Sequence, residues 1–356
     1  MLIPITISLL ISTIFLNIGL ALNGSFFLSE KIGSAKTGAV LGAAESAESQ
    51  EAKRIIINQN NNLSRAVAGV LEEAKNLPRP RLLQLPQLDQ PLRRVSTDQA
   101  EKPKLLDPDY DLPAQNGVIL DYDDSLFFAK RPDQSRPIAS ITKLFTAYTF
   151  LDYNPGWEAS YEIRPEDKRE GGKIYLFTGD RVKVKDLFYF SLVGSDNTAT
   201  AALVQSTGLS EEEFVKKMNA KVNELGLKNT RLVDPVGLKD GNISTAREVA
   251  LFTKIALAKE EISRASVTKV YEFKTEQGRK KIITSTNELL NSFPAEGISL
   301  LGGKTGHVNS SGYCLAGQFK NYDGQAIVTV ILGAESDRDR FSLTKKLVDL
   351  YYKNRP

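Results

Sequence analysis

The chain opens on an uninterrupted apolar pattern. No charged side chain occurs in Met1–Ser29, and the run LIPITISLLISTIFLNIGLAL within it is long enough to cross a bilayer as a helix. A cleaved signal peptide has a shorter apolar core, a basic start and a small-residue cleavage site, which this run does not show. The pattern favours an uncleaved transmembrane anchor, with a cleaved signal segment as the alternative. Lys31 and Lys36 follow the run, so the positive-inside rule gives no support for export of what comes after it.

Residues 30–109 lack a sustained apolar period. Small polar stretches are followed by PRPRLLQLPQLDQPLRRVSTDQAEKPK, which is rich in Pro and charge. Pro interrupts both helices and sheets, and segments of this composition rarely build a core. We expect a largely disordered spacer with one short helix, Leu63–Leu77.

Regular periodicity begins near Leu112 and predicts one globular domain over residues 110–356. NGVILDYDDSLFFAKR predicts two strands with a turn at Asp123–Asp124, and GYCLAGQF and AIVTVILGA predict a hairpin through KNYDGQ. Besides a helix that follows Ser140, apolar residues at helical spacing predict helices over Lys185–Ser206, Glu211–Leu225, Ala246–Ala258 and Asp339–Lys353. The expected fold class is α/β (α+β): an antiparallel sheet built from N- and C-terminal strands, flanked by helices, with an inserted helical subdomain.

Composition excludes several functions. The net charge of +3 is too small to indicate a nucleic-acid partner, and no basic stripe is interleaved with aromatic residues. The single cysteine, Cys314, cannot form an internal disulfide and is expected to be a small buried residue. With one His, His307, and no H-E-x-x-H motif, the chain predicts no zinc site, and we expect no metal or cofactor.

Three short motifs carry candidate chemistry. Ser140 and Lys143 stand three residues apart in RPIASITKLFTAYTF, Ser195–Asn197 interrupts SLVGSDNTATAAL, and Lys304–Gly306 lies in LLGGKTGHVNSSGYCLAG. Each motif alone is weak evidence, because S-x-x-K occurs on many helices, and S-D-N and K-T-G are common caps and turns. Nucleotide binding is excluded at the third motif. GISLLGGKT has five residues, not four, before its Gly-Lys-Thr, and a strand pattern follows where a phosphate loop needs a helix.

The three motifs together, in this order, are those of penicillin-binding proteins and class A β-lactamases. From about Leu112 to Tyr352 the chain resembles the serine D-alanyl-D-alanine carboxypeptidases, the low-molecular-mass penicillin-binding proteins of peptidase family S11, which have a β-lactamase/transpeptidase-like fold. GDRVKVKDLFYFSLVGSDNTAT and FVKKMNAKVNELGLKNTRLVDPVGLKDGNISTAREVAL carry much of the likeness. The resemblance implies removal of terminal D-alanine from peptidoglycan stem pentapeptides and inhibition by β-lactam antibiotics. The family often adds a β-rich domain and a C-terminal anchor, and we expect neither before Pro356.

The resemblance also implies catalytic roles. Ser140 is the expected nucleophile, and Lys143, on the same helix face, is its base. A lysine serves as a base only when its pKa falls, through burial or a neighbouring cation such as Lys304. Ser195 is expected to relay a proton to the leaving amine, and Asn197 to hold the substrate amide or orient Lys143.

Substrate binding is expected at the third motif and near the C-terminus. The backbone N–H groups of Ser140 and His307 form the oxyanion hole by analogy with the family. Thr305 and Gly306 belong to the binding strand, and Thr305, Lys304 and Arg340 are expected to hold the substrate's carboxylate. Arg340 is selected because DRDRF matches a strand-end segment of the family. The alternative is that Arg338 and Arg340 are solvated, and Arg247 is expected to be structural.

Several alternatives stay open. A β-lactamase of class A uses an additional Glu, which TRLVDPVGLKDGN does not offer, and Glu288–Asn291 stands too close to Lys304. A D,D-endopeptidase or transpeptidase fits the same motifs. A non-catalytic wall scaffold is disfavoured by the complete motif set, and a Ser-His-Asp triad through His307 is disfavoured because Lys143 holds the position of the base. The expected location is extracytoplasmic, tethered to the cytoplasmic membrane, or secreted if the N-terminal segment is cleaved.

Overall fold

A computed structural model describes residues 112–171 and 174–353. Three sequence predictions lie outside the described residues: the anchor Met1–Ser29, the spacer at 30–109 and the helix Leu63–Leu77 within it. Within the described part, no helix has the length and apolar character needed to span a membrane.

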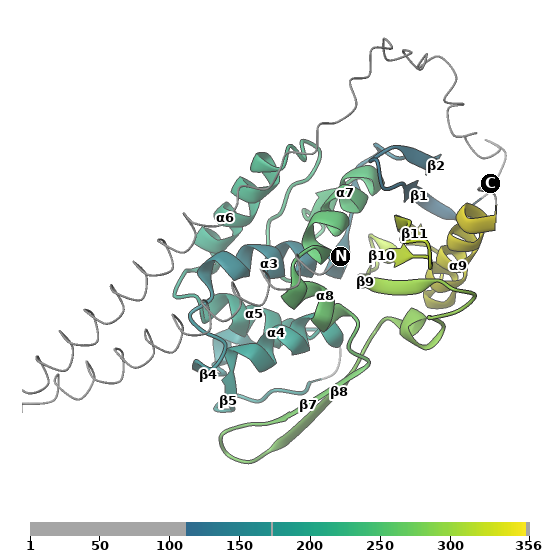
Figure 1. The fold of residues 1–356 in the computed structure, drawn as a ribbon. Coiled ribbons are helices and arrows are strands. Elements are labelled where there is room, and N and C mark those ends of the chain that lie inside the picture. Colours follow the sequence, from purple (N-terminus) through teal and green to yellow (C-terminus); the bar gives the residue numbers. More distant parts are fainter. Residues whose placement is uncertain (1–111, 172–173, 354–356) are drawn as a thin grey trace, which may run out of the picture. The chain divides into compact units, whose positions relative to one another are not determined.

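An antiparallel sheet joins the two ends of the described chain (Figure 1). Its strand order is β2-β1-β11-β10-β9. The strands are β1 (Ala114–Leu120), β2 (Leu126–Lys130), β9 (Ser299–Val308), β10 (Gly312–Lys320) and β11 (Ala326–Ala334). Val118 pairs with Val330 across the β1–β11 junction, where the two ends of the domain meet. The turn residue Asp124 has a left-handed φ of 67°, as a tight hairpin turn favours. Both predicted hairpins and the fold class are confirmed.

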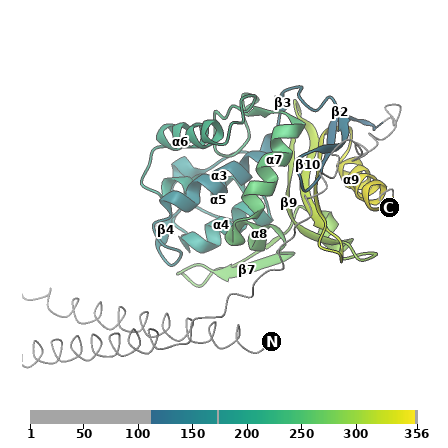
Figure 2. The ribbon, with the colours of Figure 1, turned by 45° about the horizontal axis from the view of Figure 1, so that its top comes forward.

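Helices cover both faces of the sheet (Figure 2). α7 packs on β10 and β11 from one side, and α9 packs on them from the other. The helices are α3 (Thr142–Phe150), α4 (Val184–Val193), α5 (Asn197–Gln205), α6 (Glu211–Glu224), α7 (Ala246–Leu257), α8 (Glu260–Ser266) and α9 (Asp337–Lys353). Successive residues of a strand point to opposite faces of the sheet, so the sheet contributes to two hydrophobic cores. Val330 belongs to the core shared with the helical subdomain, and Ile331 belongs to the core shared with α9.

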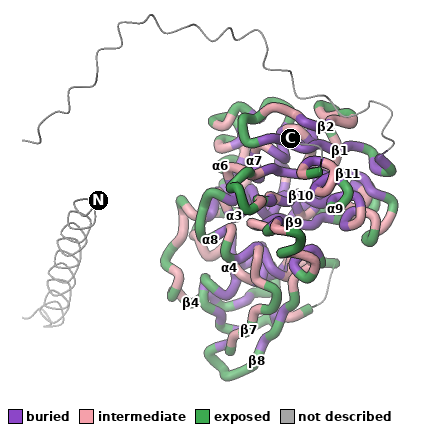
Figure 3. The backbone as a smooth tube through the Cα atoms, turned by 45° about the vertical axis from the view of Figure 1, so that its right-hand side comes forward, coloured by how far each residue is buried: buried purple, intermediate pink, exposed green. Residues whose placement is uncertain are grey.

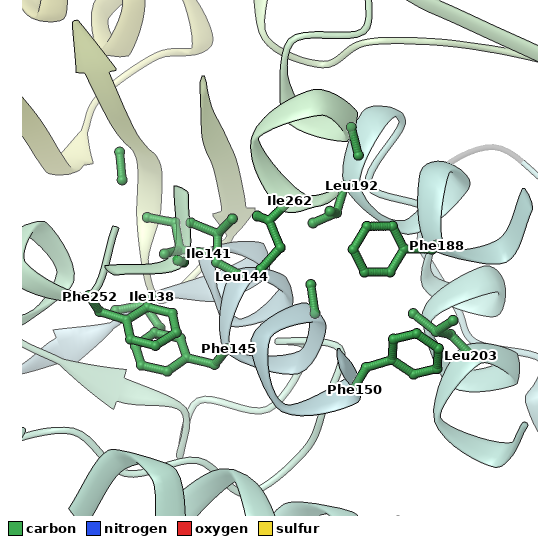
Figure 4. Packing of buried hydrophobic residues seen from close by; sticks show 14 of the residues in the cluster. Ile138, Ile141, Leu144, Phe145, Phe150, Phe188, Leu192, Leu203, Phe252 and Ile262 are labelled. Atoms are coloured by element: carbon green, nitrogen blue, oxygen red, sulfur yellow. The ribbon is translucent and has the colours of Figure 1, made fainter. Parts of the chain in front are cut away.

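Helix α3 is the centre of the helical subdomain. Eight of its nine residues are buried, and these include Thr142, Lys143, Thr146 and Thr149 besides the apolar side chains. Phe145 stacks on Phe252 of α7 with 3.6 Å between ring centroids, and Phe150 packs against Phe188 of α4 (Figure 4). Figure 3 shows how burial varies over the domain: the tip of the β7–β8 hairpin is exposed, whereas the interior of the domain is buried. Helix α3 is therefore packed against the helices that surround it, α4 to α8.

The predicted single helix Lys185–Ser206 is wrong. The chain breaks between α4 and α5, because Ser195 adopts a left-handed φ of 57° and the Asp196 side chain caps α5 by accepting from the N–H of Ala199. The other helix predictions that fall within the described residues are confirmed, those over Glu211–Leu225, Ala246–Ala258 and Asp339–Lys353 to within two residues at each end.

Short elements complete the domain, and the sequence patterns did not reveal them. The remaining strands are β3 (Arg136–Pro137), β4 (Ser160–Glu162), β5 (Arg181–Lys183), β6 (Ile243–Ser244), β7 (Val270–Lys274) and β8 (Lys280–Thr284). The 3-10 helices are η2 (Ala139–Ile141), η3 (Leu151–Tyr153), η4 (Pro165–Asp167) and η5 (Glu288–Asn291). The β7–β8 hairpin lies on α4, where Tyr271 stacks on Tyr189 and Phe273 meets Phe190 edge-on.

Candidate active site

Ser140 lies in the tight turn that precedes α3. Its neighbour Ala139 has a left-handed φ of 47°. Two glycines allow other segments to approach this turn closely. A Cβ atom on Gly237 would lie 2.1 Å from the Ala139 carbonyl oxygen, and one on Gly306 would lie 2.9 Å from the Ile138 carbonyl oxygen. The turn is therefore held between strand β9 and the segment around Gly237, with no space for a larger residue at either glycine.

Lys143 connects three parts of the site. Its Nζ lies 2.9 Å from Ser140 Oγ, 2.9 Å from Asn197 Oδ1 and 2.7 Å from the Val236 carbonyl oxygen. The contact between Ser140 and Lys143 that the S-x-x-K spacing predicts is present, although Ser140 belongs to the 3-10 turn and only Lys143 to α3. The first two motifs also meet here, through Asn197.

Burial changes the chemistry of Lys143. Its side chain is fully buried, and this desolvation lowers its pKa to about 7, against the opposing effect of the Asp196 and Asp234 carboxylates. A neutral amine has two N–H bonds and a lone pair. The two N–H groups suit the Asn197 and Val236 oxygens, and the lone pair is left to accept the Ser140 hydroxyl proton.

A second amine–hydroxyl pair lies beside the first. Lys304 Nζ is 2.8 Å from Ser195 Oγ and 3.0 Å from the Thr305 carbonyl oxygen. Burial, with Lys143 and Arg340 nearby, holds the pKa of Lys304 well below its ordinary value. The left-handed backbone of Ser195, between α4 and α5, brings its hydroxyl to this position.

Asn197 is the first residue of α5, and both ends of its side-chain amide are engaged. Oδ1 accepts from Lys143, and Nδ2 donates to the carbonyl oxygens of Glu170, at 2.9 Å, and Gly171, at 3.3 Å. Of the two expected roles, orientation of Lys143 is the one whose contacts are present.

The third motif occupies β9, the edge strand of the sheet beside Ser140. Thr305 Oγ1 lies 2.6 Å from Thr286 Oγ1, and a Cβ atom on Gly306 would lie 3.1 Å from the Ser140 nitrogen. The exposed His307 ring stacks on Tyr313 at 4.0 Å. Among the described residues, no hydrogen bond joins the His307 ring to Ser140, so the contacts of Ser140 favour Lys143 over a histidine base.

Arg340 lies behind the same strand, in the first turn of α9. Its side chain is buried, and its Nη1 donates to the Gly306 carbonyl oxygen at 3.1 Å while its other end pairs with Asp337. The solvated alternative is therefore wrong for Arg340, although it describes the exposed Arg338. Arg340 follows the end of β11 at Ala334 and lies within the predicted C-terminal helix, which begins at Asp337.

The expectation that Cys314 is a small buried residue is confirmed. Cys314 is fully buried in β10. Arg247 pairs with Asp133 through two contacts of 2.6 and 3.0 Å, at the N-terminal end of α7. Across residues 112–171 and 174–353, no three His, Cys, Asp or Glu side chains are grouped as metal ligands.

Sequence reasoning missed the segment that supplies the third partner of Lys143. The Asp234 carboxylate accepts the N–H groups of Val236, Gly237 and Lys239 at 2.6 to 2.9 Å, which folds the chain so that the Val236 carbonyl faces Lys143. Asn242 fixes this turn to α3 by donating to Thr142 Oγ1 at 3.0 Å. An Asp followed by Pro and a nearby Gly does indicate a local turn, but not which carbonyl it presents.

Comparison with known proteins agrees with this geometry. The D-alanyl-D-alanine carboxypeptidase family, Peptidase_S11, matches residues 101–336. The D-alanyl-D-alanine carboxypeptidase DacF of Bacillus subtilis is 30% identical over 67% of this chain, and the chain spans 62% of that relative's length. A D-alanyl-D-alanine endopeptidase of Haemophilus influenzae is 33% identical over 67% of this chain and 82% of its own length.

Solved structures resemble the described domain. The crystal structure of the Streptomyces K15 DD-transpeptidase aligns with a TM-score of 0.63 and 25% identity, over 68% of this chain and 98% of that one. Penicillin binding protein 5 from Haemophilus influenzae aligns with a TM-score of 0.62 and 27% identity, over 68% of this chain and 72% of that one. Because the family match extends over more than half of the sequence and includes all three motifs, the chain belongs to the D-alanyl-D-alanine carboxypeptidase family, peptidase family S11.

Proposed function

We propose that this protein is a serine D-alanyl-D-alanine carboxypeptidase that removes the terminal D-alanine of peptidoglycan stem pentapeptides through an acyl-Ser140 ester. The observation that carries the proposal is the Ser140–Lys143 pair, with 2.9 Å between Oγ and Nζ and a Lys143 pKa of about 7. A lysine with this pKa is substantially neutral at physiological pH and can act as a general base.

In the acylation step, Lys143 Nζ takes the Ser140 hydroxyl proton as Oγ attacks the carbonyl carbon of the penultimate D-alanine. The N–H groups of Ser140 and His307 stabilise the resulting oxyanion. The C–N bond then breaks, and the leaving amine takes a proton that passes from Lys143 through the Ser195 hydroxyl. Lys304, 2.8 Å from Ser195 Oγ, orients that hydroxyl.

In the deacylation step, water attacks the ester carbonyl and gives up a proton, and Ser140 Oγ leaves and is reprotonated through Lys143. Lys143 is then neutral again, so the cycle needs no metal or cofactor. Arg340 and Thr305, with Lys304, hold the carboxylate of the terminal residue. The buried Arg340 guanidinium suits this role, since it lies behind the strand that carries Thr305 and has an Nε without a partner among the described residues.

A second candidate is D,D-endopeptidase activity, in which the leaving amine belongs to a cross-linked stem rather than to free D-alanine. One relative that this chain covers over 82% of its length is an endopeptidase. Both reactions use the same acyl-Ser140 step, and the solved DD-transpeptidase neighbour indicates that the fold also accommodates an amine acceptor.

One experiment separates these activities. Mass spectrometry of pentapeptide and cross-linked muropeptides incubated with the protein should show loss of one D-alanine from pentapeptide ends. Release of monomers from cross-linked dimers would instead support the endopeptidase. Ser140→Ala should abolish both turnover and covalent labelling by a fluorescent penicillin, and labelling that persists in this variant would show that the nucleophile is misassigned.

We further propose that the protein acts outside the cytoplasm, where its peptidoglycan substrate lies, and that Met1–Ser29 tethers it to the cytoplasmic membrane. The support is the long uncharged run in this segment, which has the length of a membrane-spanning helix. β-Lactam antibiotics are the expected covalent inhibitors, because they acylate the same Ser140.

A further inference from the structure

Thr286 lies in the segment that joins β8 to η5, between two parts of the candidate site. Its hydroxyl oxygen lies 2.6 Å from that of Thr305, and its backbone N–H donates to the Val193 carbonyl oxygen at 3.1 Å. Val193 ends α4, two residues before Ser195. Thr286 therefore contacts both the strand that carries the third motif and the helix that leads to the second, although the proposed chemistry gives it no part.

Each residue of the third motif is held by a different neighbour. Lys304 bonds to the second motif through its amine, and the Gly306 carbonyl accepts from Arg340. Thr305 is buried, and among the described residues Thr286 is the only hydrogen-bond partner of its hydroxyl. The orientation of the hydroxyl that is expected to meet the substrate carboxylate therefore depends on Thr286.

The chemistry of a carboxylate determines the direction of this hydrogen bond. A hydroxyl has one proton to donate, and a carboxylate can only accept. When Thr305 donates its proton to the substrate carboxylate, the proton between the two threonines must come from Thr286. A hydroxyl that accepts one hydrogen bond is a stronger donor of the next, because the bonds polarise one another.

We propose that Thr286 is a positioning residue for carboxylate recognition, whose hydroxyl donates to Thr305 while Thr305 donates to the terminal carboxylate of the substrate. The proposal rests on the proposed carboxypeptidase function and adds a residue to its binding step. The backbone bond to Val193 does not depend on the side chain of Thr286, so the hydroxyl can be removed while that bond is kept. Thr286→Val does this, and it leaves a methyl group against the buried Thr305 hydroxyl, which favours rotation of that hydroxyl away from its place.

Binding without turnover tests this role. In the full chain carrying Ser140→Ala, affinity is measured for a peptide that ends in D-alanyl-D-alanine. We expect Thr286→Val to weaken binding about fivefold, as the loss of one hydrogen bond provides, and Thr286→Ser to keep the parent affinity. Thr284→Val, at an exposed threonine two residues earlier in β8, is the matched control and should leave binding unchanged.

A double-mutant cycle separates positioning from a general structural effect. In a Thr305→Val background, Thr286→Val should cause no further loss of affinity, because the hydroxyl that it orients is absent. Distortion of β9 would instead weaken binding in both backgrounds. Full affinity in Thr286→Val, an equal loss in Thr286→Ser or Thr284→Val, or a loss that persists in the Thr305→Val background would overturn the proposal.

Acylation by a penicillin repeats the cycle with Ser140 intact, since a penicillin also carries a carboxylate. Its second-order rate constant should fall about fivefold in Thr286→Val, and this effect should disappear in the Thr305→Val background. Failure of the unsubstituted protein to release D-alanine from any peptide would reject the proposed function. The binding and acylation cycles would still decide the role of Thr286.

Discussion

At the scale of single residues, the protonation of Lys143 controls the proposed reaction. The base must be neutral to accept the Ser140 proton, and burial lowers its pKa to about 7. The rate constant for acylation should therefore rise with pH through about 7 and level off above it, falling about tenfold per pH unit on the acid side. Stopped-flow measurement of acylation by a fluorescent penicillin from pH 5 to pH 9 checks this. A rate that is flat across this range would exclude Lys143 as the titrating base.

Asp234 offers a second test of the same base. Its negative charge raises the pKa of Lys143 against the effect of burial. Asp234→Asn removes that charge while keeping a side-chain oxygen for the turn, so the acid limb of the acylation profile should move to lower pH. Asp349→Asn, on the exposed side of α9, is the matched control and should leave the limb in place. A shift to higher pH in Asp234→Asn would mean that the substitution acts by another route.

Arg340 can act by binding the substrate carboxylate or by holding the Gly306 carbonyl, and substrates with and without a free terminal carboxylate distinguish these two roles. If its guanidinium holds the substrate carboxylate, Arg340→Ala should weaken use of peptides with a free terminal carboxylate by about 1.5–3 kcal/mol in kcat/KM. Amidated peptides should lose much less. Equal losses for both substrates would indicate that Arg340 acts only by holding the Gly306 carbonyl, to which it donates at 3.1 Å.

At the scale of elements, the junction between α4 and α5 depends on contact with the β7–β8 hairpin. A Cβ atom on Gly194 would lie 1.9 Å from Ile283 Cδ1, and Ile283 is buried in β8. Gly194→Ala therefore forces Ile283 to move, which should lower the free energy of unfolding by about 1–3 kcal/mol.

A double-mutant cycle isolates this contact. Ile283→Ala alone should destabilise by about 2–5 kcal/mol through the cavity that it leaves. The pair Gly194→Ala with Ile283→Ala should lose less than the sum, since the cavity accommodates the added methyl group. Urea unfolding of the four proteins gives the coupling energy. Strict additivity would show that the two residues do not oppose each other.

The same junction shows what sequence patterns can and cannot predict. Apolar residues recur at helical spacing on both sides of Ser195, so the pattern of Lys185–Ser206 predicted one helix. Only the polar interruption at Ser195 marked the break, and that residue was recognised for its chemistry rather than its backbone. β4 and β5 have three residues each, which is too short for an alternating pattern to stand out from chance. Long strands such as β11, by contrast, were predictable because β-branched residues, here Ile327–Ile331, form an unbroken run within them.

In the candidate site, too, some groups could be predicted from the sequence and others could not. Side chains whose type is required by the chemistry, such as Ser140, Lys143 and Lys304, could be predicted from motif order. The Val236 carbonyl and the Glu170 carbonyl, which accept from Lys143 and Asn197, could not, because every residue carries a carbonyl and only the fold selects one. The pairing of Lys304 with Ser195 rather than with Ser140 likewise depends on how β9 meets the α4–α5 junction.

At the scale of the whole molecule, the site depends on segments that are distant in sequence. Ser140 follows the N-terminal strands, Ser195 and Asn197 belong to the inserted helices, and Lys304 lies on a C-terminal strand. β11 lies at the centre of the sheet, between β1 and β10, and β10 in turn holds β9, so loss of β1 or β11 disrupts the sheet that supports β9. A soluble fragment for the assays should therefore begin before β1, near residue 105.

The proposed role of Met1–Ser29 as a membrane tether leads to a prediction about where the protein is found. The sequence predicts a spacer over residues 30–109, and a flexible chain of that length would have an r.m.s. span of about 50 Å. A tether of this reach would let the enzyme act on wall some distance from the bilayer. Because Met1–Ser29 lacks a small-residue cleavage site, we expect it to be retained, so that carbonate extraction leaves the protein in the membrane pellet at its full 39.3 kDa. A soluble product that begins near residue 24 would show instead that the segment is a cleaved signal peptide, and that the domain is released on export.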